Sequence, residues 1–400
     1  MIRLIKRRRF AFENTNNPIN SSATYFDVII IGAGPAGCTA ALGLKDAGLR
    51  VLLVDKSDFP RDKVCGDAIG SRAIRVLKSI DRNLADAFEQ FPHKVLSSGW
   101  KLVAPNGRQV KLSFVNHGYV STRLKFDAFL FDCVKQYSNT EIRTGEKVSA
   151  IEKMEQGWRM SLESGESYSG AVILGCDGAQ GVTRKLTNQR IDPQNYSGAV
   201  RAYFENIAGL EEGIIEIYLD KNFLPGYFWI FPLGNNLSNV GFGMLSSEIS
   251  KQKVDLKKAL NNIISSNPEL KKRFQNALQT GDTKGFGLPL GGKRVTTSGE
   301  RFLLCGDSAA LIDPLNGEGI GNAMLSGKLA ADVLIEAFKK SDFSQTFFQT
   351  YDSKLEEKLR PELRSKLRMQ KAFNRTWLIN FMVLIGSKSS WIREAVGKKL

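Results

Sequence analysis

The first strong pattern in the chain is a continuous apolar run at Phe26–Ile31 that is rich in β-branched residues. Such a run predicts a strand buried on both faces, as in a parallel sheet. A glycine-rich turn follows at residues 32–37, then helix formers up to Gly48, and then a second apolar run at Val51–Val54. This order predicts a βαβ unit at the start of a doubly wound domain.

Alternating apolar and polar positions are typical of the middle of the chain. Residues 100–114 alternate around Asn106-Gly107, which is a strong signal for a β-hairpin. Two further stretches of this kind flank Gly165 and Gly234. We therefore expect antiparallel strands in this part of the chain.

Helical spacing returns in the last third of the sequence. Residues 255–277 have it, with Asp255 as the expected N-cap, and so do residues from about 318 to 339. Between the two helical stretches, Phe302–Cys305 is a short apolar run that predicts another strand.

The glycine-rich turn is the first candidate binding site. Gly32, Gly34 and Gly37 have the G-x-G-x-x-G spacing. In that motif the first glycine makes a tight turn, the second lets a pyrophosphate approach the backbone, and the third lets helix and strand pack closely. Asp55 ends the second strand, where a carboxylate accepts hydrogen bonds from ribose hydroxyls. These residues predict a dinucleotide site; the alternative is an ordinary glycine-rich turn.

Two later segments indicate which dinucleotide is bound. Residues 173–184 read ILGCDGAQGVTR, and residues 302–322 read FLLCGDSAALIDPLNGEGIGN. They resemble the second and third fingerprints of the FAD-dependent group that contains aromatic hydroxylases, flavin-dependent halogenases and geranylgeranyl reductases. The resemblance implies that Asp307 contacts the ribityl chain of FAD. It also implies that the turn at 316–322 lies against the flavin at a helix N-terminus, where the helix dipole favours the negative charge of reduced flavin.

Two other segments indicate the branch of this group. Residues 58–66 read DFPRDKVCG, and residues 224–234 read LPGYFWIFPLG. Both resemble the geranylgeranyl reductase family, which carries a Lys-x-Cys-Gly segment at the flavin and a similar aromatic segment in its substrate domain. Only Gly226 separates Pro225 from Tyr227, an interval shorter than the family's. The Trp-x-Trp-x-Ile-Pro motif of halogenases is absent, and Ala310 stands where aromatic hydroxylases usually have histidine, so halogenation is disfavoured and hydroxylation stays an alternative.

The expected contacts to FAD come from the glycine-rich turn, from residues 55–66, from the segments at 173–184 and 302–322, and from Arg123, which resembles an arginine that contacts the cofactor in the same group. They are Gly32, Gly34, Pro35, Ala36, Gly37, Asp55, Lys56, Arg61, Cys65, Gly66, Arg123, Asp177, Gly178, Gly306, Asp307, Pro314, Gly317, Gly319 and Ile320.

Three side chains are candidates for catalysis: Cys65, Tyr227 and Trp229. A thiol beside the flavin could position a substrate alkene or donate a proton after hydride transfer; the alternative is a small residue packed where a larger one would clash. Tyr227, Trp229 and Phe231 have period-two spacing and share one face of a strand. That face suits a prenyl chain or an aromatic ring, and plain core packing is the alternative.

Together these patterns predict an α/β protein. A doubly wound, Rossmann-like FAD-binding domain is interrupted by a mostly antiparallel β-sheet substrate domain and followed by a helical C-terminus. The expected ranges are a basic lead-in at 1–24, the FAD-binding domain at 25–80, 120–187 and 285–340, the substrate domain at 81–119 and 188–284, and a basic helical segment at 341–400.

The predicted function is that of an FAD-dependent oxidoreductase. The resemblance implies that it reduces C=C bonds of a lipophilic, isoprenoid-type substrate by hydride transfer from reduced flavin. NAD(P)H and an electron-donor protein are the candidate sources of electrons. The alternatives are an FAD-dependent monooxygenase of an aromatic or polyketide-like substrate, and a non-catalytic, membrane-associated flavin-binding protein.

Composition restricts the partners and the compartment. Five cysteines without repeated spacing predict free thiols in the cytoplasm, and two histidines are too few for a His-rich metal site, so no metal is expected. The net charge is +15, and most of it lies at the ends: residues 1–25 carry five Lys or Arg against one Glu, and residues 351–400 carry twelve against five acidic residues. Because no nucleic-acid-binding motif accompanies this charge, an anionic membrane surface is the candidate partner rather than nucleic acid.

The C-terminal part contains one apolar segment, WLINFMVLI at residues 377–385, between basic residues on both sides. It predicts either a helix that lies in a membrane interface, on the inner face of the membrane, or a helix that docks on the substrate domain. No run of about 20 apolar residues is present, so no transmembrane helix is expected.

Overall fold

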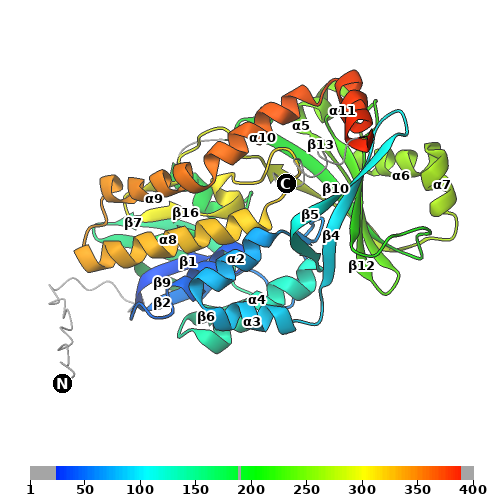
Figure 1. The fold of residues 1–400 in the computed structure, drawn as a ribbon. Helices are drawn as coiled ribbons and strands as arrows, with labels where there is room; N and C mark the ends of the chain where they lie inside the picture. Colours follow the sequence, from blue (N-terminus) through cyan, green and yellow to red (C-terminus); the bar gives the residue numbers. More distant parts are fainter. Residues whose placement is uncertain (1–23, 188–190, 389–400) are drawn as a thin grey trace, which may run out of the picture.

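The computed structural model of the chain describes residues 24–187 and 191–388, and it contains two sheets that lie side by side (Figure 1). The lead-in at 1–23 and Trp391 lie outside the described residues. The first sheet has the strand order β15-β16-β9-β1-β2-β6, and β7 and β8 extend it from β9. Its strands are β1 (Tyr25–Ile31), β2 (Val51–Val54), β6 (Glu141–Arg143), β7 (Val148–Met154), β8 (Gly157–Leu162), β9 (Ser167–Gly175), β15 (Ser298–Gly299) and β16 (Phe302–Leu304).

The centre of the first sheet is parallel, as the apolar runs predict. Strand β1 pairs in parallel with β2 on one side and with β9 on the other, and β9 pairs in parallel with β16. Val28, Ile29 and Ile30 have no exposed surface, so the strand is buried on both faces. The doubly wound domain is therefore confirmed.

The second sheet is mostly antiparallel. Its order is β14-β10-β13-β12-β11-β4-β5-β3, and among the described strands only the β11–β4 pair runs parallel. The expected hairpins turn at Gly107 and Gly234, which both have positive φ. The strands are β3 (Ala68–Ile69), β4 (Val95–Val103), β5 (Gln109–Val120), β10 (Tyr196–Glu205), β11 (Ile214–Tyr218), β12 (Tyr227–Gly234), β13 (Leu237–Leu245) and β14 (Leu278–Pro289).

The helices divide between the two sheets and the C-terminal part. Helices α8 and α2 cover the first sheet, α6 and α7 lie at the far side of the second, and α10 runs along the top of the molecule to α11 (Figure 1). Their bounds are α1 (Pro35–Gly43), α2 (Ser71–Ile80), α3 (Arg82–Gln90), α4 (Arg123–Tyr137), α5 (Ser246–Gln252), α6 (Leu256–Ser266), α7 (Pro268–Arg273), α8 (Ile320–Lys340), α9 (Gln345–Lys358), α10 (Arg360–Ala372) and α11 (Thr376–Lys388).

Some boundaries differ from the expected ones. The helical stretch at 255–277 is two helices, because the side chain of Asn267 caps a new helix that begins at Pro268. Strand β3, in the range assigned to the FAD-binding domain, pairs with β5 of the second sheet. Helix α3, in the range assigned to the substrate domain, buries Leu84 and Phe88 in the core of the first domain.

Helices α1 and α8 pack unusually closely. A Cβ atom at Gly327 would overlap the carbonyl of Ala36, and a Cβ at Gly43 would lie 2.8 Å from that of Ala331. Small residues on both helices therefore let the two backbones approach each other directly. This contact positions the two helices relative to each other. The candidate site lies at their N-termini.

The apolar C-terminal segment forms α11, and one side of it docks on the second sheet. Ile379 and Val383 are buried in a cluster with Val110 and Leu112 of β5 and with Leu224. Within the described part of the chain, no helix is long and apolar enough to cross a membrane.

Candidate active site

The three glycine-containing segments meet in space. Gly32 has a φ of +103°, and a Cβ atom there would overlap the carbonyl of Cys176, so the first segment touches the second. The amide of Gly178 donates a hydrogen bond of 2.9 Å to the hydroxyl of Ser308, which joins the second segment to the third. Residues that are about 275 positions apart in sequence thus form one site.

The start of α1 is suited to a phosphate group. Gly34 is the N-cap of this helix, and no side chain among the described residues caps it. A Cβ atom on Gly34 would have only the Nη2 atom of Arg61 nearby, at 3.4 Å, so the space in front of the helix is free of protein backbone. Uncapped helix N–H groups together with a guanidinium form an anion site.

The carboxylate of Asp55 is held at the end of β2 beside this turn. Its Oδ2 accepts the amide of Ala33 at 2.7 Å, and its Oδ1 accepts the amide of Ser57 at 2.9 Å. A carboxylate has about four lone-pair positions, so acceptor capacity remains for the hydroxyls of a ribose. Lys56, beside it, is exposed to solvent.

The start of α8 is the second uncapped helix end. Its N-cap, Gly319, has no side-chain hydrogen bond, and a Cβ atom there would lie 3.7 Å from Oδ1 of Asp307. Gly317 has a φ of +74°, and Ile320 is buried as the first residue of the helix. The carboxylate of Asp307 also pairs with Lys63 at 2.8 Å. The turn thus presents helix N–H groups and a carboxylate side by side.

Arg123 has a different environment from the expected one. Its guanidinium is buried and makes two hydrogen bonds, of 2.6 and 2.7 Å, to the carboxylate of Asp127. Arg61 binds the same carboxylate at 3.0 Å. Arg123 therefore lies next to the α1 site through Asp127 and Arg61, and its direct contact with the cofactor stays a prediction.

The aromatic face of β12 lies against the Cys65-Gly66 segment. A Cβ atom on Gly66 would lie 3.1 Å from the ring of Phe231 and 3.7 Å from Nε1 of Trp229. The hydroxyl of Tyr227 donates to the carbonyl of Asn316 at 2.6 Å, which ties the strand to the turn before α8. The three candidate catalytic residues are thus brought together with the glycine-rich turn.

Cys65 is a protonated thiol in this environment. Burial raises the pKa of its thiol, and nearby Arg123 opposes that rise. The carbonyl of Cys65 accepts a hydrogen bond of 2.8 Å from Asn239, whose Oδ1 in turn accepts the indole N–H of Trp229. The position of the thiol is therefore fixed by the second sheet.

Asp67 is a residue that the sequence patterns did not reveal. It is fully buried and has a positive φ of 67°. Its Oδ2 accepts the hydroxyl of Tyr203 and the amide of Asn239, both at 2.8 Å. Burial raises the pKa of this carboxyl to about 6, and the two hydrogen bonds limit the rise. Its partners come from β10 and β13, so no local motif could have identified it.

Three other expected residues make hydrogen bonds within the protein, and their contact with the cofactor stays a prediction. Burial raises the pKa of Asp177, whose carboxylate accepts hydrogen bonds from the amide and hydroxyl of Thr183 and from Ser308. The carbonyl of Pro314 accepts a hydrogen bond from Gln370 of α10. The amide of Gly306 donates to the hydroxyl of Ser326.

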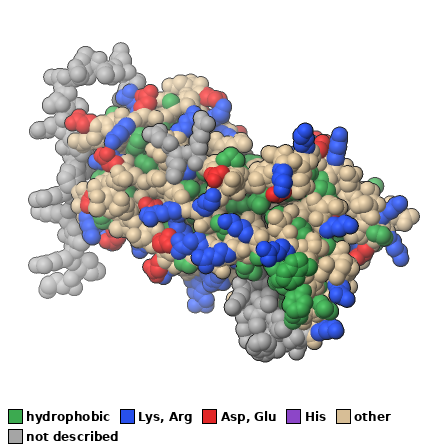
Figure 2. Space-filling model, turned by 90° about the horizontal axis from the view of Figure 1, so that it is seen from above, with side chains coloured by type: hydrophobic (Ala, Val, Ile, Leu, Met, Phe, Trp, Pro, Cys, Tyr) green, Lys and Arg blue, Asp and Glu red, His purple; other side chains and the backbone are tan. Residues whose placement is uncertain are grey.

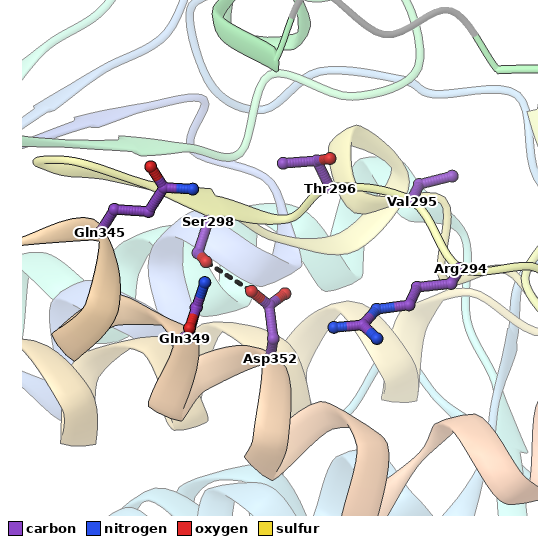
Figure 3. Close-up of a pocket in the computed structure, with 7 residues that line it drawn as sticks. All are labelled: Arg294, Val295, Thr296, Ser298, Gln345, Gln349 and Asp352. Carbon is purple, nitrogen blue, oxygen red and sulfur yellow. Dashed lines mark hydrogen bonds between the residues drawn. The ribbon is translucent and has the colours of Figure 1, made fainter.

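A separate cavity of about 340 Å³ lies between α9 and the strand segment before β15. Its lining is polar, and Figure 3 shows the hydroxyl of Ser298 pointing at the carboxylate of Asp352, to which it donates a hydrogen bond. Asp352 also accepts the hydroxyl of Thr297. None of the predicted site residues lines this cavity, so it is not part of the candidate active site. The described residues contain no cluster of three or more side chains suited to a metal ion.

The site fits FAD. The uncapped N-terminus of α1, the open backbone at Gly34 and Arg61 beside it suit a pyrophosphate, and Asp55 suits a ribose. The uncapped N-terminus of α8 suits the flavin. The sheet arrangement and this site define a flavin-dependent oxidoreductase with an inserted substrate domain.

Comparison with known proteins gives the family. The family model described as FAD binding domain matches residues 25–357. A menaquinone reductase of Mycobacterium tuberculosis is 33% identical over 327 residues, which cover 77% of this chain and 76% of that protein. A digeranylgeranylglycerophospholipid reductase of Methanosarcina acetivorans is 29% identical over 332 residues, covering 80% and 77%. The chain therefore belongs to the FAD binding domain family.

Solved structures share the fold. A geranylgeranyl bacteriochlorophyll reductase-like protein from Thermoplasma acidophilum has a TM-score of 0.80 at 22% identity, with 92% of each chain covered. The halogenase PltM in complex with phloroglucinol and FAD has a TM-score of 0.69 at 17% identity, covering 82% of this chain and 72% of that one. The predicted fold class is confirmed.

Replacing Gly34 by Val should remove FAD without unfolding the protein. The φ of −74° and ψ of −173° at Gly34 suit valine, and the nearest protein atom to the new side chain is the flexible end of Arg61. The side chain would, however, occupy the space that the pyrophosphate needs. We expect an unchanged circular dichroism spectrum and no bound FAD after gel filtration. Wild-type protein should release FAD rather than FMN on denaturation.

Gly32→Ala is the matched control for this experiment. Its side chain would overlap backbone at a positive φ, so we expect lower thermal stability as well as loss of FAD. Gly34→Val protein that retains FAD would show that this turn does not hold the pyrophosphate.

Asp67→Asn should flatten the dependence of stability on pH. Because the folded pKa of about 6 lies above the ordinary 3.8, folded protein loses stability as pH rises between these values. A shift of about 2 pKa units corresponds to about 2 to 3 kcal/mol. Urea unfolding of wild type at fixed FAD concentration should show a fall of this order from pH ~4 to pH ~7. The fall should be smaller in the Asp67→Asn variant and unchanged in the exposed control Asp282→Asn, and an equal slope in all three proteins would contradict the assignment.

Proposed function

We propose that this protein reduces a C=C bond of a lipophilic, isoprenoid-type substrate. FAD, when bound in its reduced form, supplies a hydride for that reaction. The observation that carries the proposal is the contact between the aromatic face of β12 and the Cys65-Gly66 segment, directly beside the turn before α8. An apolar wall, a thiol and the cofactor turn thereby lie together.

The names of the relatives support the substrate class. Two of the similar proteins are named menaquinone reductase and digeranylgeranylglycerophospholipid reductase. Geranylgeranyl groups are isoprenoid chains with isolated C=C bonds. The rings of Trp229 and Phe231, which are buried in this structure, form an apolar wall without charge that suits such a chain.

The residues of this chain supply the proton. When hydride adds to one alkene carbon, the other carbon must take up a proton, so that the product gains two hydrogens. The raised pKa of Cys65 keeps its thiol protonated at neutral pH, and the S–H bond is the one that breaks. The resulting thiolate is stabilised by the charge of Arg123 and regains its proton from solvent.

Tyr227 and Trp229 act as positioning residues in this proposal. Tyr227 is fixed by its bond to the carbonyl of Asn316, and Trp229 by its bond to Asn239. Both side chains therefore hold the substrate chain without rearranging. NAD(P)H or a donor protein would return electrons to the cofactor.

Chemically reduced protein should transfer electrons to a polyprenyl substrate under nitrogen. We expect the visible spectrum of oxidised FAD to return on addition of the substrate, and mass spectrometry to show a gain of two hydrogens per reduced bond. A monooxygenase would require dioxygen and would add the mass of an oxygen atom. A product that gains oxygen, and forms only in air, would overturn the reductase proposal and leave the fold and FAD site standing.

Cys65→Ala should slow this anaerobic reoxidation by a factor of about 10² or more, because general-acid catalysis by one group contributes rate factors of that size. FAD content should stay unchanged. Cys133→Ala, which changes a buried cysteine of α4 that is not among the site residues, is the control and should react as wild type does. An unchanged rate in Cys65→Ala protein would show that this thiol only packs.

A further inference from the structure

Helix α11 has a second apolar side that nothing in the described structure covers. Trp377, Phe381 and Met382 are 64%, 52% and 43% exposed, while Ile379 and Val383 on the other side are buried. Trp377 and Phe381 are four positions apart and therefore lie one above the other on the helix. A helix that only docks on its own domain would be polar on its outer side.

The chain around this side carries positive charge alone. No acidic residue occurs between Glu362 and Glu394, and that interval contains Arg364, Lys366, Arg368, Lys371, Arg375, Lys388 and Arg393. Of these, Arg368, Lys371 and Arg375 are exposed and take part in none of the ion pairs found in residues 24–187 and 191–388.

Apolar and basic side chains gather on one face of the molecule. Figure 2, seen from above, shows a group of hydrophobic side chains with Lys and Arg side chains near it, in the right half of the molecule, where α11 lies in Figure 1. Met369 of α10 is also 40% exposed and lies between Arg368 and Lys371 in sequence. We call Trp377, Phe381 and Met382 together with Arg368, Lys371 and Arg375 the α11 face.

We propose that the α11 face docks on an anionic lipid bilayer. Trp377, Phe381 and Met382 insert at the boundary of headgroups and acyl chains, and the three basic side chains bind lipid phosphates. Tryptophan suits this depth because its ring is apolar and its N–H is polar. A second copy of the chain is a poor occupant of the face, because a symmetric dimer would set the same unpaired cations against one another.

The α11 face is connected to the candidate active site through its own packing. α11 packs on Leu224, three residues before Tyr227 in the aromatic segment. Lys366 of α10 pairs with Asp313 at 2.7 Å, and Gln370 donates to the carbonyl of Pro314, both in the segment before α8. If the proposed reductase function holds, docking also places the aromatic wall next to the membrane that contains a lipophilic substrate; the docking itself does not depend on that function.

Vesicle co-sedimentation of the full-length, FAD-loaded protein tests the proposal. We expect binding to phosphatidylcholine vesicles that contain phosphatidylglycerol, weaker binding at high salt, and little binding to phosphatidylcholine alone. The double variants Trp377→Ser/Phe381→Ser and Lys371→Glu/Arg375→Glu should each bind at least about tenfold more weakly. Their FAD content should equal that of wild type, because none of these residues touches the FAD site.

Matched controls separate the face from general charge and hydrophobicity. Leu278→Ser changes a side chain of similar exposure, 61%, on β14, and Lys257→Glu/Lys258→Glu changes two exposed lysines of α6. Both should bind vesicles as wild type does.

Equal binding by the α11 variants and wild type would overturn the proposal. A change in oligomeric state on sedimentation velocity, without a change in vesicle binding, would assign the face to a second copy instead. Since none of these readouts measures turnover, failure of the reductase proposal would be seen separately, in the anaerobic assay.

Discussion

The site depends on two closely packed helices, α1 and α8, that both begin without side-chain caps. Their backbones touch because Gly327 has no side chain to hold α8 away from Ala36 of α1. The free N–H groups at each helix start give a partial positive charge. The charge at the start of α1 suits the pyrophosphate, and the charge at the start of α8 suits the reduced flavin. The parallel strands β1, β9 and β16 fix this geometry, since the loops at their carboxyl ends carry the three glycine-containing segments.

The glycine-rich segments, and with them the FAD-binding domain, could be predicted from the sequence. Each glycine there meets a backbone requirement that arises within a short stretch of the chain. Gly32 needs positive φ, and Gly37 leaves no room for a Cβ atom next to Gly32. The hairpins at Gly107 and Gly234 are local in the same sense. The second domain could be predicted to contain a mostly antiparallel sheet. Its exact limits could not be predicted, because the pairing of β3 with β5 joins segments that are far apart in sequence.

The parts that sequence could not give depend on long-range contacts. Asp67 gains its role from Tyr203 and Asn239, which lie 136 and 172 positions further along the chain. The sequence left two alternatives for the last apolar segment, docking on the protein or on a membrane. In α11 one side is docked through Ile379 and Val383, and the other, with Trp377, is exposed. Hydropathy alone cannot tell which side of such a helix is buried and which is exposed. That depends on which residues of the helix contact β5.

A crystal structure of the protein with FAD and a polyprenyl chain tests the central claim most directly. We expect the pyrophosphate at Gly34, the flavin between the turn at Gly317–Gly321 and the Cys65-Gly66 segment, and the prenyl chain along Tyr227 and Trp229. A flavin bound away from the start of α8, or a prenyl chain on another surface, would contradict the account.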